Sequence, residues 1–236
     1  MQHPVSIVTG AGSGIGRSIA RMLAEKGHHV VLVGRTEQKL AEASDELRAI
    51  GPGDVMIVPA DVADSEQAAS VVDQTIERFG RVDNLVNCAG VAPMIPIERT
   101  TEETLEQCFS INTFGPALLI VRCWPHFKKQ KSGCVVNIGT MGSTDPFAGF
   151  FAYAASKSAL DSLTRSVARE GRSSGIRSFS VNPGAVETRA LRNNFSEKVV
   201  PPHNAMHPDV VAKVVVDCIE GQRPDDQGKC IFLPSP

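Results

Sequence analysis

The 236-residue sequence lacks the cysteine patterns that bind metal or form disulfide frameworks. Its six cysteines are scattered, with no Cys-x-x-Cys pair and no zinc-type spacing to the six histidines. We therefore expect no metal site. We expect most of the cysteines to be small buried hydrophobic residues, which suits a reducing, cytoplasmic setting.

The sequence also lacks a strong charge bias and long apolar runs. Its 24 basic and 26 acidic residues give a net charge of −2, without a basic block. This balance argues against nucleic acid and acidic membrane surfaces as partners. No apolar run approaches the length of a membrane span, and the first strand begins too early for a signal peptide to precede it. With no repeat and no linker, residues 1–236 are expected to form one domain.

Short β-branched runs alternate with amphipathic segments along the chain. This alternation predicts a doubly wound α/β fold, with a parallel sheet of about seven strands and helices on both faces. The expected strands are Val5–Thr9, His29–Val33, Val55–Val58, Asn84–Asn87, Cys134–Ile138, Ile176–Asn182 and Cys230–Leu233. The expected helices span about 15–26, 37–50, 65–79, 101–130, 152–174 and 208–220.

Tyr153 and Lys157 are four residues apart in a helix-compatible segment without proline. Side chains at this spacing lie on the same face of a helix. A nearby ammonium favours the phenolate and lowers the pKa of a tyrosine, which makes the pair a candidate general acid–base unit. The alternative is a packed tyrosine beside a solvated lysine.

A glycine-rich turn follows the first expected strand. Thr9-Gly10-x-x-x-Gly14-x-Gly16 leads directly into an amphipathic helix. Glycines let the backbone approach a ligand closely, and the free N–H groups at a helix N-terminus attract phosphate. We therefore expect a pyrophosphate site here; a simple flexible connection is the alternative.

These two motifs, with Asn87-Cys-Ala-Gly90 between them and Asn182-Pro-Gly184 after them, resemble the short-chain dehydrogenase/reductase family. The resemblance covers about residues 4–190 and is closest to carbonyl and 3-oxoacyl carrier-protein reductases. It implies a Rossmann-type fold and hydride transfer between a nicotinamide cofactor and a carbonyl or secondary alcohol. A nucleotide-binding regulatory or scaffold protein with weak or no catalysis is the alternative. A sugar-nucleotide epimerase or dehydratase is disfavoured by the short chain, because such relatives need extra substrate-binding segments.

The end of the second strand bears on the choice of cofactor. NAD sites usually carry a carboxylate there, whereas this sequence has Gly34-Arg35-Thr36. Gly34 leaves space for a 2′-phosphate that Arg35 neutralises, with Thr36 and Ser13 as further donors. This pattern favours NADP. Glu37 and a merely solvated Arg35 leave NAD possible.

The resemblance assigns further residues to the cofactor. Asp61 and Val62 are expected beside the adenine, although Asp61 or Asp64 could instead cap a helix. Pro183-Gly184 is expected to form the floor of the nicotinamide pocket and Thr188 to hold the carboxamide. The expected cofactor-binding residues are Gly10, Ser13, Gly14, Ile15, Gly16, Arg35, Thr36, Asp61, Val62, Asn87, Ala89, Gly90, Tyr153, Lys157, Pro183, Gly184, Val186 and Thr188.

The resemblance also assigns catalytic roles to Asn112, Thr140, Tyr153 and Lys157. Asn112 is expected to hold a water that relays protons to Lys157, with a satisfied core asparagine as the alternative. The family serine that precedes the tyrosine by thirteen residues is replaced by Thr140. A threonine hydroxyl can donate the same hydrogen bond. Ser143, three residues on, is the other candidate.

The least regular stretch, Thr188–His207, lies where the resemblance implies a substrate-covering loop. An ordinary surface loop is the alternative. The partner implied is a small carbonyl or alcohol. Phe147, Phe150, Phe151, Met141 and Leu191 hint at an apolar lining for it, unless they belong to the core. The two long helices near 101–130 and 152–174, rich in small and apolar residues, predict a homodimer or homotetramer.

Overall fold

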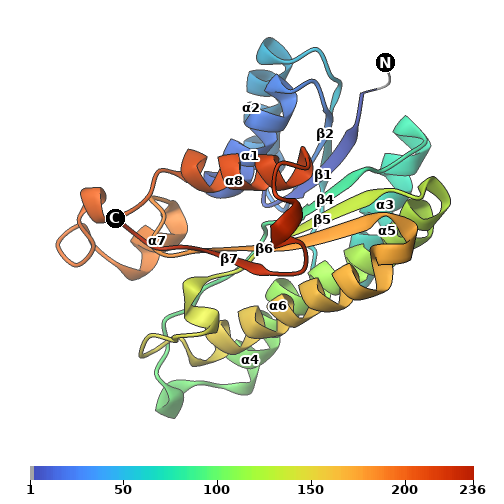
Figure 1. Ribbon diagram of the computed structural model, residues 1–236. Helices are drawn as coiled ribbons and strands as arrows, with labels where there is room; N and C mark the ends of the chain where they lie inside the picture. Colours follow the sequence, from blue (N-terminus) through green and yellow to red (C-terminus); the bar gives the residue numbers. More distant parts are fainter. Residues whose placement is uncertain (1–2) are drawn as a thin grey trace.

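The computed structural model describes residues 3–236, which form a seven-stranded parallel sheet in the order β3-β2-β1-β4-β5-β6-β7 (Figure 1). This confirms the doubly wound α/β fold. The strands are β1 Val5–Thr9, β2 His29–Gly34, β3 Val55–Pro59, β4 Asn84–Asn87, β5 Gly133–Ile138, β6 Ile176–Pro183 and β7 Cys230–Leu233. The helices are α1 Gly14–Glu25, α2 Glu37–Ile50, α3 Ser65–Phe79, α4 Glu102–Phe109, α5 Gly115–Gln130, α6 Phe151–Gly171, α7 Arg189–Asn194 and α8 Pro208–Ile219.

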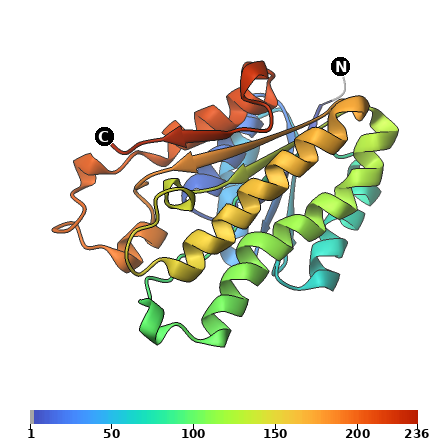
Figure 2. The ribbon, with the colours of Figure 1, turned by 60° about the horizontal axis from the view of Figure 1, so that its bottom comes forward.

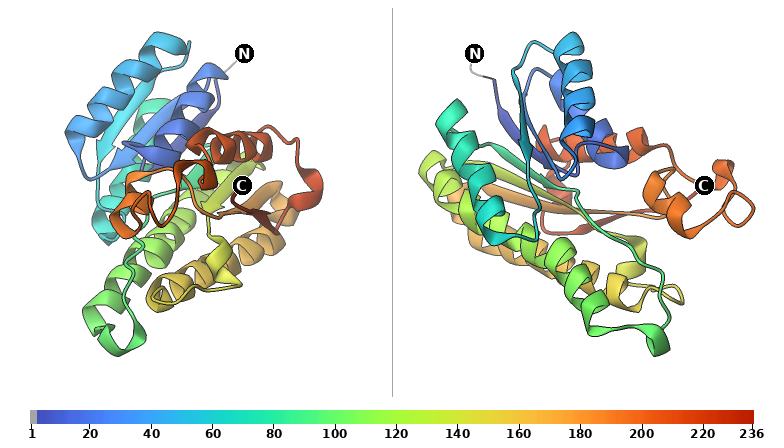
Figure 3. Two further views of the ribbon diagram at one scale, coloured as in Figure 1. Left: turned by 90° about the vertical axis from the view of Figure 1, so that its left-hand side faces the viewer. Right: turned by 180° about the vertical axis from the view of Figure 1, so that it is seen from behind.

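Helices cover both faces of the sheet, and its central strands are therefore buried along their whole length. Helices α1, α2 and α8 pack on one face, and α3, α5 and α6 on the other (Figures 1 and 3). In Figure 2, α5 in green and α6 in yellow and orange run side by side across the second face. Each face therefore has its own apolar core.

The helix expected over 101–130 is interrupted, and this is a correction to the sequence prediction. Helix α4 ends at Phe109, a π-helical turn spans Ser110–Phe114, and α5 begins at Gly115. At Gly115 the chain runs so close to the loop after β3 that an added Cβ would lie 2.6 Å from the carbonyl oxygen of Val62. π-helical turns are rare and are frequently found at functional sites, and this one contains Asn112.

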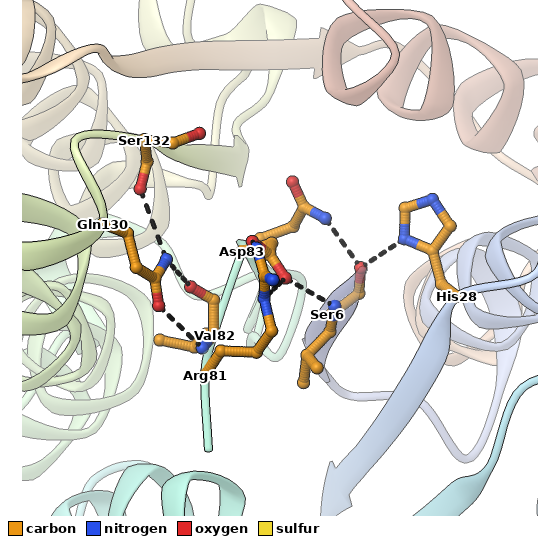
Figure 4. Close-up of polar contacts among 9 residues, drawn as sticks. Ser6, His28, Arg81, Val82, Asp83, Gln130 and Ser132 are labelled. Atoms are coloured by element: carbon orange, nitrogen blue, oxygen red, sulfur yellow. Dashed lines mark hydrogen bonds and ion pairs between the residues drawn. The ribbon is translucent and has the colours of Figure 1, made fainter. Parts of the chain in front are cut away.

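The amino ends of the strands hold a buried polar network (Figure 4). The Ser6 hydroxyl accepts a hydrogen bond from Asn84 at 2.9 Å and lies 2.8 Å from His28 Nδ1. His28 Nε2 lies 3.3 Å from a carboxylate oxygen of Glu220. Ser6, His28 and Glu220 have the residue types of a catalytic triad, but their position argues against catalysis. Ser6 is fully buried at the end of β1 away from the glycine-rich turn, where no substrate reaches it.

Among residues 3–236, no helix is both long and apolar enough to span a bilayer.

Candidate active site

Two cavities beyond the carboxyl ends of the strands share Gly90 and Val91 in their linings and so form one cleft. The smaller, about 240 Å³, lies over the glycine-rich turn and the end of β2. The larger, about 590 Å³, reaches from Ile15 to α7 and contains Tyr153. Ligands of open parallel sheets bind at this edge. The cleft is therefore long enough to take an extended ligand at one end and a second molecule at the other.

The glycine-rich turn has the backbone geometry of a phosphate cradle. Gly10 and Gly14 have φ angles of 68° and 52°, which disfavour any residue with a Cβ. An added Cβ at Gly16 would lie 2.3 Å from the carbonyl oxygen of Gly10. Ser13 precedes α1 without a side-chain cap, and the first turn of α1 carries no acidic residue. The helix N-terminus is thus left open to an anion.

Cationic side chains gather where β2 ends. Arg35 lines the smaller cavity with its side chain 66% exposed, and it lies 3.9 Å from a carboxylate oxygen of Asp61. Thr36 precedes α2 without capping it, so its hydroxyl is free of that bond. Lys39, in the first turn of α2, lines the same cavity and was missed by the sequence interpretation. A lysine one helical turn after a Gly-Arg-Thr strand end is the signal that points to it.

The two aspartates after β3 have separate tasks. Asp64 caps α3, accepting hydrogen bonds from the backbone of Glu66 and Gln67, and these bonds lower its pKa. Asp61 and Val62 line the cavity instead. Asp61 accepts a bond from Ala63 N, yet one carboxylate oxygen faces Arg35. The geometry therefore leaves Asp61 available to a ligand and assigns the helix cap to Asp64.

Tyr153 lies in the larger cavity with Thr140 and Lys157. The Tyr153 ring packs edge-on against Phe150, with 5.6 Å between ring centroids. Burial raises the pKa of the Tyr153 phenol, while a hydrogen bond with the Thr140 hydroxyl lowers it. The two hydroxyl groups thus point to one place in the cavity, where they can bond the same oxygen atom.

Lys157 is not a solvated lysine. It is 4% exposed, and its ammonium donates a 2.7 Å hydrogen bond to the carbonyl oxygen of Ile138 at the end of β5. Burial lowers the pKa of Lys157 to about 8, opposed by Cys88 and Asp161. The expected lowering of the Tyr153 pKa by Lys157 is not found here, because burial dominates and the opposing bond comes from Thr140.

The two candidate hydroxyl groups differ in what they already bond. The Ser143 hydroxyl donates to the Thr140 carbonyl oxygen at 2.9 Å and accepts from Asn182 at 3.1 Å. The Thr140 hydroxyl accepts a 3.2 Å bond from the backbone of Gly142, and its own proton remains for Tyr153 or a ligand. Thr140 also lines the cavity, which Ser143 does not.

Asn112 lies outside the cavity lining and is fully buried. Its amide donates to the Val91 carbonyl oxygen and to the Ser156 hydroxyl, and its oxygen accepts from Val91 N, each at 2.9 Å. It therefore joins the loop after β4 to α6, which carries Tyr153 and Lys157. Its expected role in a proton relay stays a prediction.

The other expected cofactor residues divide into two groups. Gly14, Gly16 and Asn87 do not line the cleft: the glycines shape the turn, and Asn87 donates a 2.8 Å bond to Asn137 inside the sheet. The remaining residues line the cleft, and their contacts with a cofactor stay a prediction. They are Gly10, Ser13, Ile15, Arg35, Thr36, Asp61, Val62, Ala89, Gly90, Tyr153, Lys157, Pro183, Gly184, Val186 and Thr188.

Thr188 links the segment after β6 to the start of α7. Its hydroxyl caps α7 by accepting from Leu191 N at 3.3 Å, and it donates to the Val186 carbonyl oxygen at 3.1 Å. Its methyl carbon would lie 3.1 Å from a Cβ added to Gly14, so α7 starts directly beside the glycine-rich turn. Figure 1 shows α7 beyond the ends of β6 and β7.

The larger cavity is mainly apolar. Phe195 contacts Phe150 with 6.0 Å between ring centroids, which ties the segment after α7 to the wall beside Tyr153. The expectation that Phe151 belongs to this lining or to the core is wrong, because its side chain is 47% exposed and does not line the cavity. The apolar lining includes Met141, Phe147, Phe150, Leu191, Phe195 and Val200.

Comparison with known proteins places these features in a family. The family model for short chain dehydrogenases matches residues 4–199. An uncharacterized oxidoreductase of Thermotoga maritima is 38% identical over 190 residues, covering 80% of this chain and 74% of the relative. An uncharacterized oxidoreductase of Bacillus subtilis is 32% identical over 223 residues, covering 94% and 86%.

Solved structures agree along nearly the whole chain. Levodione reductase superposes with a TM-score of 0.91 at 28% identity, covering 99% of this chain and 97% of that one. The 3-ketoacyl-(acyl-carrier-protein) reductase of Brucella melitensis, complexed with NADH, superposes with a TM-score of 0.90 at 27% identity, covering 98% and 96%. Both the family match and these neighbours are oxidoreductases. The chain therefore belongs to the short-chain dehydrogenase family of nicotinamide-dependent oxidoreductases.

Proposed function

We propose that the protein is an NADP-dependent reductase of carbonyl compounds with apolar substituents, acting also on the corresponding secondary alcohols. The convergence of Tyr153, Thr140 and Lys157 in one apolar cavity carries this proposal. The test is carbonyl-dependent oxidation of NADPH. A non-catalytic nucleotide-binding protein would bind NADPH without consuming it.

The cleft fits a dinucleotide. The positive φ angles at Gly10 and Gly14 and the uncapped start of α1 suit the pyrophosphate. Arg35, Thr36 and Lys39 would hold the adenosine phosphate, and Asp61 would contact the adenine. Pro183, Gly184 and Thr188 would flank the nicotinamide. When bound, the cofactor supplies or accepts the hydride.

The protein side chains would donate the proton to the substrate carbonyl oxygen and hold that oxygen by hydrogen bonds. Tyr153 gives its proton to the carbonyl oxygen in reduction, and burial keeps that proton in place by raising the phenol pKa. Thr140 donates a second hydrogen bond to the same oxygen. Lys157, held by the carbonyl oxygen of Ile138, offers its ammonium to the ribose of the cofactor.

The substrate end of the cleft favours apolar molecules. Among residues 3–236, Asp145 and Lys157 are the only charged residues that line the larger cavity. With Lys157 committed to the ribose, an anionic substrate finds no free cation there. The segment 188–207, which supplies Leu191, Phe195 and Val200 to the lining, is proposed to cover the substrate.

The preference for NADP is tested by Arg35→Ala. Loss of a charge-assisted hydrogen bond should weaken NADPH binding by about 10–100-fold, with little change for NADH. Nicotinamide fluorescence titration with both cofactors measures the difference. Lys39→Ala should shift the same ratio in the same direction. Equal losses for the two cofactors would show that Arg35 is structural.

A double variant at the end of β2 should reverse the cofactor preference. Gly34 has room for a side chain, because an added Cβ would contact only Leu40 Cδ2, at 3.4 Å. Arg35→Ala combined with Gly34→Asp should therefore fold and favour NADH, since a carboxylate bonds the ribose hydroxyl and repels the phosphate.

We also propose a homo-oligomer that uses the exposed face of α5. Phe114, the last residue of the π turn that leads into α5, and Val121 within α5 are 60% and 67% exposed. Val121→Asp should dissociate the assembly in sedimentation velocity experiments. Val210→Asp, on the exposed side of α8, is the control and should leave it intact. A wild-type monomer at micromolar concentration would contradict the proposal.

A further inference from the structure

A buried carboxylate lies behind the proposed catalytic groups without contributing to the mechanism above. Asp161 is 4% exposed and follows Lys157 by one helical turn of α6. Ser180 on β6 donates a 2.6 Å hydrogen bond to it. The Asn182 amide donates to both of its oxygens, at 3.1 and 3.0 Å. Burying a carboxylate costs several kcal/mol unless partners of this kind compensate.

The Asn182 contacts continue to the loop that carries Thr140. The same amide nitrogen lies 3.1 Å from the Thr140 carbonyl oxygen and 3.1 Å from the Ser143 hydroxyl. A Cβ added to Gly139 would lie 2.6 Å from the Asn182 amide, so the loop packs directly on this side chain. Asp161 therefore orients Asn182, and Asn182 holds the residue whose hydroxyl faces Tyr153.

Asp161 also acts on Lys157 through charge. Burial lowers the pKa of Lys157, and Cys88 and then the Asp161 carboxylate raise it against that larger effect. On its other side, the Cys230 thiol interacts with the Asp161 carboxylate, and the same thiol also interacts with Arg165. Without the negative charge of Asp161, the Lys157 ammonium would lose its proton at a lower pH.

We propose that Asp161 is a positioning residue of the reaction, which holds the Thr140 loop through Asn182 and keeps Lys157 protonated. The inference rests on the proposed function, since it supports the roles given there to Thr140 and Lys157.

Asp161→Asn tests both effects, because the two side chains have nearly the same shape. Misplacement of Thr140 should lower kcat/KM by on the order of 10–100-fold near neutral pH. The alkaline limb of the kcat/KM profile should move to lower pH, because an ammonium without a nearby anion deprotonates earlier. Asp161→Ser, which leaves room for water, provides the same test if the isosteric variant does not fold.

Two further variants separate the effects. Asn182→Ala breaks the link to Thr140 but keeps the charge, so the rate should fall while the alkaline limb stays in place. Ser180→Ala removes a different partner of Asp161 and should leave the rate and the limb within about twofold of wild type. An unmoved limb in Asp161→Asn, or an equal loss in Ser180→Ala, would overturn the inference.

A readout without substrate distinguishes this inference from the proposed function. NADPH affinity should fall at alkaline pH as Lys157 deprotonates, and in Asp161→Asn this fall should begin at lower pH. Fluorescence titration across pH measures it. A wild type that reduces no carbonyl would refute the proposed function alone, whereas identical affinity profiles would refute the role of Asp161.

Discussion

Tyr153→Phe is expected to lower kcat by on the order of 10²–10⁴-fold, the contribution of a positioned general acid. NADPH affinity should change little, because the substitution removes one hydroxyl. The edge-on contact with Phe150 needs only the ring, so the cavity wall should persist. Steady-state kinetics with a hydrophobic ketone, together with NADPH fluorescence titration, measure the two quantities.

The ionisation of Tyr153 can be followed separately in the wild-type protein. Tyr153 is the only tyrosine in the sequence, so phenolate absorbance in the near ultraviolet reports on this residue alone. The wild type should ionise at a pH above that of a free tyrosine, because burial raises the pKa of Tyr153. Retention of the wild-type rate in Tyr153→Phe would remove the residue from the mechanism.

Thr140→Val should cost on the order of 10–1000-fold in kcat/KM, as expected for the loss of one donor to a developing oxyanion. Valine keeps the shape of threonine and deletes its hydroxyl group. Thr140→Ser should keep the activity, or raise it for bulkier ketones, because the hydroxyl stays and the methyl group goes. Kinetics with two ketones of different bulk measure both variants.

Ser143→Ala is the matched control for Thr140. The Ser143 hydroxyl is held by the Thr140 carbonyl oxygen and by Asn182, so its removal should have a mild effect. A severe Ser143→Ala together with a harmless Thr140→Val would show that Ser143 is the hydroxyl that contacts the substrate.

The parallel sheet and the two ends of the cleft were predictable because local patterns encode them. β-branched runs mark the strands, and the glycines after β1 mark a turn that other residues cannot form. The four-residue spacing of Tyr153 and Lys157 needs only the geometry of one helix. Each of these signals acts over a few neighbouring residues.

Features that depend on contacts between distant segments were not predictable in the same way. The π turn that holds Asn112 depends on the packing of α4 against α6 and on the close approach of Gly115 to the loop after β3. The link from Asp161 to Thr140 joins three segments, α6, β6 and the loop after β5. The pKa of Tyr153 depends on burial, which the spacing to Lys157 does not reveal.

The measurement that tests the account most directly is NADPH oxidation by the wild-type protein with a panel of hydrophobic ketones, with identification of the alcohol formed. Tyr153→Phe is the matched control. We predict ketone-dependent loss of nicotinamide absorbance with stoichiometric alcohol, nearly absent in Tyr153→Phe. NADPH binding without turnover of any ketone, or equal turnover by both proteins, would contradict the account and favour a nucleotide-binding protein without this chemistry.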